Sequence, residues 1–372
     1  MDHSLYPTWV EIDLSAAAHN MRAVLEIAGV PLMAVVKSNA YGFGAVEISR
    51  TVLSAGATQL AVARFNEART LRQAGITAPI LVFGMVTEPE VDEAISQGVT
   101  LTLHSFENAV LFSQRAKTLG GVVRVHLKVD TGFGRLGVLP GETIDLVRAC
   151  RQTGGIQIDG IYSHLAMADE APDHPVTQQQ IQRFTSILNA LESAGLRPAW
   201  AHLANSAAAF GLPEARFDLV RVGTALLGMK PFYFQPFPGE LRRVISWKAQ
   251  LASCRLLPAG WGVSYGHEYT TEKPEWIGTL PVGYGDGFRR QPGNQVLVEG
   301  RRVPVVGRVC NDMCMVLLPH EIPVGMEVVI VGRQGGQEIT TDELIDRWHT
   351  SQADITTGIN WRVPRIYTNP VK

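Results

Sequence analysis

A lysine that follows a fully apolar run is the first residue of the chain whose type and position suggest chemistry. Lys37 comes directly after Leu32–Val36, a run that predicts a buried β-strand. Burial disfavours the charged ammonium and lowers the pKa of a lysine amine. A neutral amine in such a place can form a Schiff base with a carbonyl group. Spacing alone leaves a surface lysine in a loop equally open, because buried strands often end in charged residues.

Polar residues follow several other apolar runs in the same way. They are Asp130 to Arg135 after the run from Val122, Ser163 and His164 after the run from Ile156, Asn205 and Ser206 after the run from Trp200, and Arg221, Gly223 and Thr224 at the run from Leu219. Gly223 and Thr224 form a small-residue turn whose backbone N–H groups could face a phosphate. In a parallel barrel these positions meet at one mouth, where the loops build the active site.

The spacing of the apolar runs predicts that barrel. Between residues 30 and 225, short apolar runs alternate with amphipathic segments, as expected of βα units around a parallel sheet. The expected strands are Leu32–Val36, Gln59–Val62, Ile80–Phe83, Thr100–Leu103, Val122–Val129, Ile156–Tyr162, Trp200–Ala204 and Leu219–Val222. Helices are expected at Ser105–Leu119, with Ser105 as N-cap, and at Thr177–Ser193. About eight strands close a (β/α)8 TIM-like barrel.

A mainly β C-terminal domain is expected after Lys230, where β-branched and aromatic runs are broken by Gly and Pro. Its expected strands include Val244–Ser253, Trp276–Gly278, Gln295–Val298, Arg302–Val306 and Met326–Val331. The stretch Lys230–Pro238 is the best linker candidate. We therefore divide the chain into a barrel domain, residues 1–235, and a mainly β domain, residues 236–372. The strand Trp9–Leu14 is a candidate to pack on the second domain.

Composition and charge exclude several classes of function. The chain has 372 residues, 46% of them hydrophobic and 18% charged, with a formal net charge of -2, which is typical of an ordinary folded enzyme. Neither charge forms the long run expected of a nucleic-acid or anionic-membrane binder. No leader pattern or membrane-spanning stretch is evident, so we expect a cytoplasmic protein that acts on a small molecule. The four cysteines are too scattered for a disulfide framework or a zinc site, and no metal is expected.

The segment around Lys37 resembles the pyridoxal-phosphate attachment segment of alanine racemases. It reads Val36-Lys37-Ser38-Asn39-Ala40-Tyr41-Gly42-Phe43-Gly44. Similar segments extend across almost the whole chain, including Lys128-Val129-Asp130-Thr131-Gly132, Ser264-Tyr265-Gly266, Pro281-Val282-Gly283-Tyr284-Gly285-Asp286-Gly287 and Arg362-Val363-Pro364-Arg365. On these motifs the chain is identified as a member of the alanine racemase family of fold-type III pyridoxal-phosphate enzymes.

The resemblance implies a site built around pyridoxal 5'-phosphate. Lys37 would hold the cofactor covalently, and its other contacts would come from Tyr41, His164, Asn205, Ser206, Arg221, Gly223 and Thr224. Arg221 matches the arginine that faces the pyridine nitrogen, where many other enzymes with this cofactor place a carboxylate. A guanidinium cannot accept the ring proton, so the ring is a weaker electron sink. Side reactions such as transamination would then be limited.

Racemisation needs two acid/base groups, one on each face of the α-carbon. Lys37 can serve one face, and the resemblance supplies Tyr265 of the partner subunit for the other, which implies a homodimer with shared active sites. A free tyrosine has a pKa of about 10, so His164, lined up with Arg221, would stabilise the phenolate. The implied activity interconverts L-alanine and D-alanine, the latter for cell-wall synthesis.

The remaining implied roles concern the substrate. Arg135 resembles the residue that steadies the substrate carboxylate, and Asn311 and Asp312 match the segment near that carboxylate. Tyr284 is interpreted as part of the substrate entrance. Lys128 matches a position that is carbamylated in some family members.

Two departures from the family pattern leave the substrate open. The chain reads Asn311-Asp312-Met313 where the family usually has Met-Asp-Gln, and an ungapped count back from Arg365 places Ala353 where an active-site tyrosine is normal. Losing that phenol would open space beside the substrate side chain, so serine or a larger amino acid is an alternative substrate. A pyridoxal-phosphate-dependent decarboxylase and a non-catalytic cofactor carrier are more remote alternatives, since neither accounts for the segment around Tyr265.

Overall fold

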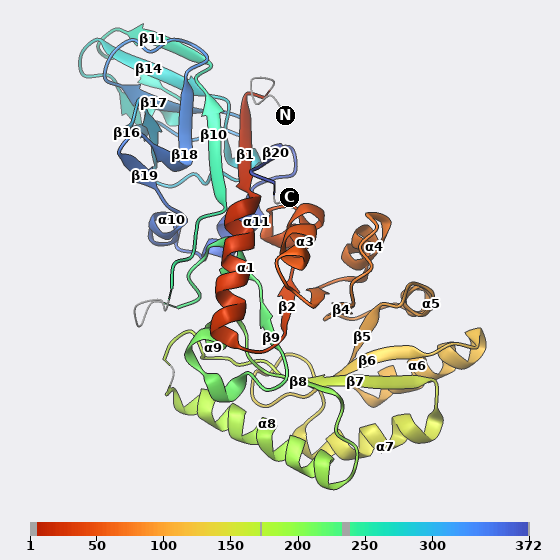
Figure 1. The fold of residues 1–372 in the computed structure, drawn as a ribbon. Coiled ribbons are helices and arrows are strands. Elements are labelled where there is room, and N and C mark those ends of the chain that lie inside the picture. The colour runs from red at the N-terminus through yellow and green to blue at the C-terminus, as the bar shows by residue number, and fades with distance from the viewer. Residues whose placement is uncertain (1–5, 172, 233–238, 371–372) are drawn as a thin grey trace. The chain divides into compact units, whose positions relative to one another are not determined.

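The computed structural model describes residues 6–171, 173–232 and 239–370. The chain divides into two compact units, whose elements are labelled in Figure 1. The barrel unit comprises residues 16–40 and 45–242, and the β unit comprises residues 1–15, 41–44 and 243–372. Residues 233–238 of the expected linker Lys230–Pro238 lie outside the described residues.

The barrel unit is built on a sheet of eight parallel strands, in the order β8-β7-β6-β5-β4-β3-β2-β9. The strands are β2 (Leu32–Val35), β3 (Gln59–Val62), β4 (Ile80–Val82), β5 (Thr100–Leu103), β6 (Val123–Lys128), β7 (Ile156–Tyr162), β8 (Trp200–His202) and β9 (Val220–Val222). No ladder of the described residues joins β8 to β9. Two backbone hydrogen bonds link them instead, from Asp218 N to Ala201 O at 3.0 Å and from Arg221 N to Ala204 O at 3.1 Å. The predicted (β/α)8 TIM-like barrel is confirmed.

Helices surround this sheet (Figure 1). They are α3 (Ala45–Ser54), α4 (Phe65–Gln73), α5 (Glu88–Gln97), α6 (Phe106–Leu119), α7 (Thr143–Thr153), α8 (Pro175–Ser193) and α9 (Ser206–Gly211), with the 3-10 helices η2 (Pro140–Glu142), η3 (Pro213–Ala215) and η4 (Thr224–Leu227). Helix α6 begins as predicted, with the Ser105 side chain accepting a hydrogen bond from Asn108 N at 3.2 Å. The helix predicted at Thr177–Ser193 lies within α8, whose buried residues include Phe184 and Leu191. Both faces of the strands are therefore covered, which explains their continuous apolar runs.

The β unit contains a mixed sheet in the order β11-β14-β17-β16-β15-β18-β10-β1-β20, with β19 paired to β18. Its strands are β1 (Thr8–Asp13), β10 (Ile245–Gln250), β11 (Ser253–Leu257), β14 (Glu275–Leu280), β15 (Gln295–Val298), β16 (Arg301–Val306), β17 (Cys314–Leu318), β18 (Glu327–Gln334), β19 (Gln337–Ile339) and β20 (Arg365–Thr368). A separate hairpin joins β12 (Gly262–Val263) to β13 (Tyr269–Thr270), and the helices are α10 (Thr341–Trp348) and α11 (Gln352–Gly358). The prediction of a mainly β C-terminal domain is confirmed. Helix α1 (Leu14–Ala28) follows β1 and leads into the barrel unit.

The sequence-based prediction of one strand in the β unit is wrong. The run Val244–Ser253 is divided between β10, which pairs with β18, and β11, which pairs with β14. At the break, Leu251 N bonds to Met326 O and Ala252 N bonds to Thr279 O, each at 2.9 Å. The chain therefore changes partner strands within one continuous apolar run, and hydropathy alone does not mark such a change.

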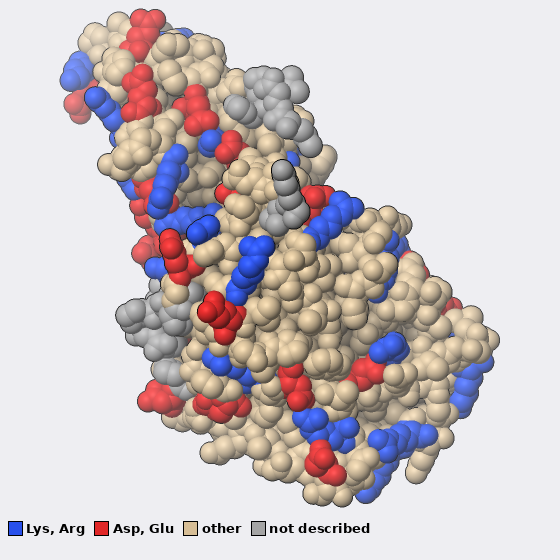
Figure 2. All heavy atoms as spheres, viewed as in Figure 1, with Lys and Arg blue, Asp and Glu red and all other residues tan. Residues whose placement is uncertain are grey.

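The surface carries both charges in mixture. Basic and acidic side chains are interspersed across the face drawn in Figure 2. Among the helices of residues 6–171, 173–232 and 239–370, none is long and apolar enough to cross a membrane. Within the same ranges, no group of three or more His, Cys, Asp or Glu side chains is placed to hold a metal ion.

Candidate active site

Lys37 lies at the end of β2, at the start of a turn with unusual backbone geometry. The short helical segment α2 (Lys37–Tyr41) contains four successive non-glycine residues with φ between 51° and 55°, namely Ser38, Asn39, Ala40 and Tyr41. Left-handed backbone costs roughly 1–2 kcal/mol for each residue with a side chain. Strain of this kind persists only where the surrounding structure imposes it, and it is concentrated at functional sites.

Hydrogen bonds within the barrel unit hold this strained turn. Ala40 N donates to Val36 O at 2.8 Å, and the Asn39 side chain accepts from Ala45 N at 2.8 Å. Ser38 N donates to the Glu67 carboxylate, which also accepts from the backbone of the chain leading into α4. Contacts with residues before and after the turn therefore fix its backbone, which begins at Lys37.

The Lys37 side chain is partly buried, and its pKa is lowered from the ordinary value of a lysine. Burial is the main cause, and the positive charge of Arg135 adds to it, while Glu67 acts in the opposite direction. Burial and the charge of Arg135 both disfavour the ammonium form. The neutral amine is therefore favoured over the ammonium more than in an ordinary lysine.

Arg221, on β9, is buried with 4% of its surface exposed. Its guanidinium donates to three carbonyl oxygens and two imidazole nitrogens: His202 O at 2.9 Å, Ser163 O at 2.8 Å, Leu203 O at 3.1 Å, His202 Nδ1 at 3.0 Å and His164 Nδ1 at 3.2 Å. All five acceptors are neutral groups. Burial lowers the pKa of Arg221 to about 10, so the guanidinium remains charged at neutral pH.

His164 and His202 are held neutral beside this cation. Burial, followed by the charge of Arg221, lowers the pKa of His164 to about 2 and that of His202 well below its ordinary value. A guanidinium has donors only, so each histidine must present an unprotonated Nδ1 to Arg221 and carry its proton on Nε2. His164 can therefore donate from Nε2 to a further group.

Lys128 is the last residue of β6, and Arg135 lies in the loop that follows it. Burial, with a smaller contribution from the charge of Arg221, lowers the pKa of Lys128 to about 7. The loop is shaped by the Asp130 carboxylate, which accepts hydrogen bonds from Gly132 N and Phe133 N, both at 2.8 Å. The exposed Arg135 stacks on the Phe133 ring, with Cζ 4.3 Å from the ring centroid. The charge of Arg135 contributes to the lowered pKa of both Lys37 and Lys128.

The predicted phosphate contacts lie together after β8 and β9. Gly223 N donates to Ser206 Oγ at 3.2 Å, and Thr224 Oγ1 lies 3.5 Å from the same oxygen. Asn205 is the N-cap of α9, and its side chain accepts from Ala208 N at 3.1 Å. Two hydroxyls and a glycine backbone therefore converge as donors of the kind that bind an anion.

Tyr265 belongs to the β unit, where it lies on a second strained turn. Ser264, Gly266 and His267 have φ values of 64°, 70° and 48°. The turn is anchored by Ser264 Oγ, which donates to Arg308 O at 2.6 Å, and Arg308 pairs with Glu268 at 2.6 Å. The Tyr265 ring itself is 65% exposed.

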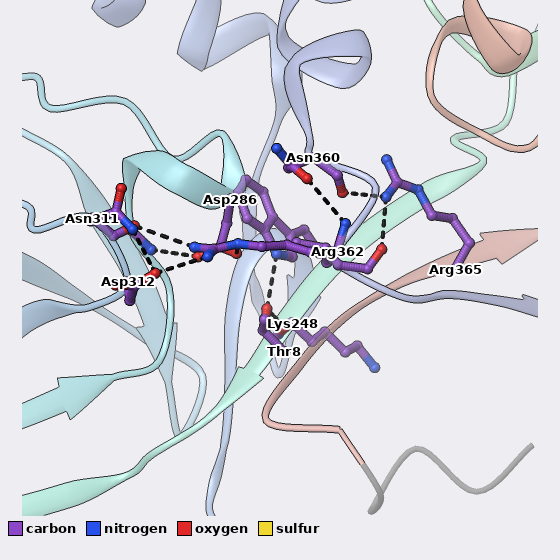
Figure 3. Close-up of polar contacts among 11 residues, drawn as sticks. Thr8, Lys248, Asp286, Asn311, Asp312, Asn360, Arg362 and Arg365 are labelled. Atoms are coloured by element: carbon purple, nitrogen blue, oxygen red, sulfur yellow. Dashed lines mark hydrogen bonds and ion pairs between the residues drawn. The ribbon is translucent and has the colours of Figure 1, made fainter.

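Asn311 and Asp312 lie on a loop that Arg362 connects to the segment containing Asp286 (Figure 3). Arg362 Nε pairs with Asp286 at 2.7 Å and its Nη1 pairs with Asp312 at 2.8 Å. Asp286 is buried, and its second oxygen accepts from Gly283 N at 2.9 Å. Hydrogen bonds from Asn311 and from Arg362 lower the pKa of Asp312. The glycine-rich segment Gly283–Gly287 is therefore a structural loop, bound to the loop of Asn311.

The remaining predicted residues of the β unit occupy separate positions. Tyr284 is 48% exposed, and the Arg290 guanidinium lies 5.0 Å from its ring centroid. Ala353 is partly buried in the first turn of α11.

Tyr265, Asn311 and Asp312 line one cavity of about 730 Å³. Tyr41 belongs to the short stretch 41–44 that clusters with the β unit.

Several residues that support these sites were not singled out from the sequence. They are His202, His126 and Tyr162 beside Arg221, and Asp286 and Arg362 in the β unit. A signal existed for His126 and His202, because each interrupts an apolar strand run with a polar side chain. For Arg362 the sequence offered only its place in the motif Arg362-Val363-Pro364-Arg365.

The fold is a (β/α)8 barrel, with a lysine of lowered pKa after the carboxyl end of a strand, where enzymes of this fold have their active sites. The sequence model of the alanine racemase N-terminal domain matches residues 12–231, and that of the alanine racemase C-terminal domain matches residues 244–367. The chain is 44% identical to an alanine racemase of Symbiobacterium thermophilum, over 97% of each chain.

Solved structures agree with this match. The chain is similar to the alanine racemase of Bacillus anthracis with bound L-Ala-P, at 37% identity and a TM-score of 0.92, covering 98% of this chain and 96% of the other. It is similar to the alanine racemase of Streptomyces lavendulae at 38% identity and a TM-score of 0.92, covering 98% of both chains. The chain belongs to the alanine racemase family and is an enzyme of the racemase class. These relatives do not favour the decarboxylase, the carrier or a racemase of larger amino acids.

The ion pair between Arg362 and Asp286 yields a test of stability. Replacing Arg362 with Met should lower the free energy of unfolding by about 2 kcal/mol, less than a fully buried pair would lose, because it leaves the Asp286 carboxylate buried without its cation. Urea unfolding would measure the change. Arg333→Met is the matched control, since Arg333 pairs with Glu338 in the same unit but is 79% exposed. An equal loss in both variants would contradict the interpretation.

The buried histidines predict a pH dependence of stability. Burial, as the main cause, lowers the pKa of His126 to about 4 and that of His164 to about 2, whereas the unfolded values are about 6.5. The unfolded chain therefore binds protons that the folded chain cannot, so the free energy of unfolding should fall as the pH falls below about 6.5. Urea unfolding between pH 7.5 and pH 5 would show this slope, and His126→Asn should reduce it. A slope that is identical in the variant would refute this assignment.

Proposed function

We propose that the protein interconverts L-alanine and D-alanine with pyridoxal 5'-phosphate, in a homodimer whose active sites use residues of both copies. The observation that carries the proposal is the partly buried Lys37 amine, with its lowered pKa, in the same unit as the buried Arg221, whose hydrogen-bond acceptors among the described residues include no carboxylate. The bound L-Ala-P of the Bacillus anthracis enzyme supports alanine as the substrate. The whole-length match supports the same conclusion.

The donor set of the barrel unit fits this cofactor. An aldehyde requires the amine of Lys37, and a phosphate suits the donors that converge at Ser206, Gly223 and Thr224. We assign Tyr41 to the phosphate as well, Asn205 to the N-cap that places Ser206, and Arg221 to the pyridine nitrogen. Bound there, the cofactor would withdraw electrons from the α-carbon of the amino acid and make its proton removable.

Two bases would then exchange the α-proton. We assign Lys37 to one face, where it would take or return a proton, because its lowered pKa favours the neutral amine relative to an ordinary lysine. We assign the opposite face to Tyr265 of a second copy of the chain, whose exposed ring is available to another molecule. His164 would support the phenolate by donating from Nε2, since its Nδ1 is occupied by Arg221.

The substrate carboxylate would be held by cations and by backbone donors. Arg135 supplies one charge, and we assign Asn311 and Asp312 of the second copy to the same end of the substrate. Lys128, with a pKa of about 7, can add carbon dioxide: its neutral amine forms the C–N bond and releases a proton to water. The resulting carbamate would face the charge of Arg135. Tyr284 would border the substrate entrance, and Ala353 would enlarge the space beside it.

The test is racemisation by the cofactor-loaded protein on a panel of L-amino acids, followed by chiral chromatography. We expect alanine to be the best substrate and Tyr265→Phe to lower kcat by about a hundredfold or more, the usual effect of losing a general base, while the bound cofactor keeps its visible absorbance. Tyr269→Phe is the matched control, because the Tyr269 hydroxyl bonds to Glu275 in the same unit. No turnover of any amino acid would contradict the proposal, and a preference for serine or larger substrates would point to Ala353.

The shared site can be tested separately by mixing two inactive variants. Lys37→Ala and Tyr265→Phe each remove one of the two proposed bases. In a mixed dimer, one of the two sites would still combine an intact Lys37 with an intact Tyr265. Mixing equal amounts after dissociation and reassociation should restore about a quarter of the wild-type activity, because about half of the dimers are mixed and each has one working site of two. Activity no higher than the sum of the separate variants would refute the shared site.

A further inference from the structure

We propose that His126 is a positioning residue for the racemase site: it fixes the proton of His202 on Nε2 and so holds the Arg221 guanidinium in one orientation. The inference rests on the proposed function for its catalytic consequence, since Arg221 matters there through the pyridine nitrogen. The three residues lie on β6, β8 and β9 of the barrel unit (Figure 1).

The direction of every hydrogen bond in this chain follows from the guanidinium. Arg221 Nη1 lies 3.0 Å from His202 Nδ1 and can only donate. His202 is neutral, so its proton must lie on Nε2, which is 2.8 Å from His126 Nδ1. His126 therefore accepts at Nδ1 and carries its own proton on Nε2. Arg221 therefore donates to His202, and His202 donates to His126.

The ring of His202 is also fixed in its plane. It stacks on Tyr162 with a centroid distance of 4.9 Å and an interplanar angle of 2°. Thr102 Oγ1 donates to Val82 O at 2.7 Å, so the Tyr162 hydroxyl must be the donor in its 2.8 Å bond to Thr102 Oγ1. All of these side chains are buried. With the ring held in this plane, the Arg221 donor excludes the proton from Nδ1, and His126 supplies the acceptor that holds the proton on Nε2.

The barrel backbone departs from regularity where His126 is seated. Its register with β7 shifts between Val125 and His126, because Val125 is opposite Ile158 while His126 is opposite Gly160. A Cβ on Gly160 would lie 2.7 Å from His126 Nδ1. A β-bulge re-aims a side chain in this way, and the glycine leaves room for the imidazole.

A histidine that merely fills the core is the competing interpretation. Barrel interiors are usually filled by branched apolar side chains, which carry no cost of polar burial. If His126 were lost, the proton of His202 could lie on Nδ1. Two N–H donors, His202 Nδ1 and the Arg221 guanidinium, would then face each other. Arg221 would lose one of its two imidazole acceptors, and its orientation would relax.

The first test needs no variant. In protein labelled with 15N-histidine, NMR should show His202 protonated at Nε2 in both the cofactor-free and the cofactor-loaded protein. A proton on His202 Nδ1 would overturn the proposal. This readout is independent of racemisation, so a protein that turns over no amino acid would refute the proposed function while the tautomer still decides the inference.

The second test compares variants of one strand. His126→Leu should lower kcat by about tenfold with little change in KM, and should raise the fraction of turnovers that end in transamination. His126→Asn places an amide oxygen near Nδ1 and should recover kcat to within about threefold. Leu127→Ala, the buried neighbour on β6, is the control and should lower stability without raising transamination. Equal transamination in His126→Leu and Leu127→Ala, or no rescue by Asn, would overturn the proposal.

Discussion

The buried guanidinium of Arg221 is the constraint on which the barrel site depends. Three carbonyl oxygens and two imidazole nitrogens hold it, so its charge is spread over dipoles rather than cancelled by a carboxylate. A buried cation of this kind keeps neighbouring histidines neutral and lowers the pKa of nearby amines. The tautomers of His164 and His202 and the proposed weak electron sink of the cofactor follow from this arrangement, and the charge of Arg221 adds to the effect of burial that lowers the pKa of Lys128.

Strain is the second feature shared by the two units. Lys37 begins a left-handed turn without glycine, and Tyr265 lies on a turn with positive φ on both sides. Such backbone is costly, so neighbouring groups must impose it. The Glu67 carboxylate and the Asn39 side-chain amide do so at Lys37, and Ser264 with Arg308 do so at Tyr265. The proposed two bases are therefore preorganised by loops, while the strands supply the charged environment.

Much of this architecture could be predicted because hydropathy reports burial. The apolar runs gave the barrel strands, and the polar residues that follow them include Lys37, His164 and Ser206. Side-chain networks were less accessible. The pairing of His126 with His202 depends on a β-bulge and on Gly160, which leave no periodic signal, and the salt bridge from Arg362 to Asp286 joins residues far apart in sequence. The break at Leu251 was missed because a change of partner strand does not interrupt an apolar run.

The most direct measurement concerns which of two lysines, the partly buried Lys37 or the buried Lys128, would carry the proposed cofactor. Lys37 and Lys128 both have a lowered pKa, and both lie in the barrel unit. Treating the cofactor-loaded protein with sodium borohydride and mapping its peptides by mass spectrometry would fix the attachment covalently. We predict the pyridoxyl mass on the peptide that contains Lys37 alone. The same mass on the Lys128 peptide, or on neither, would contradict the account.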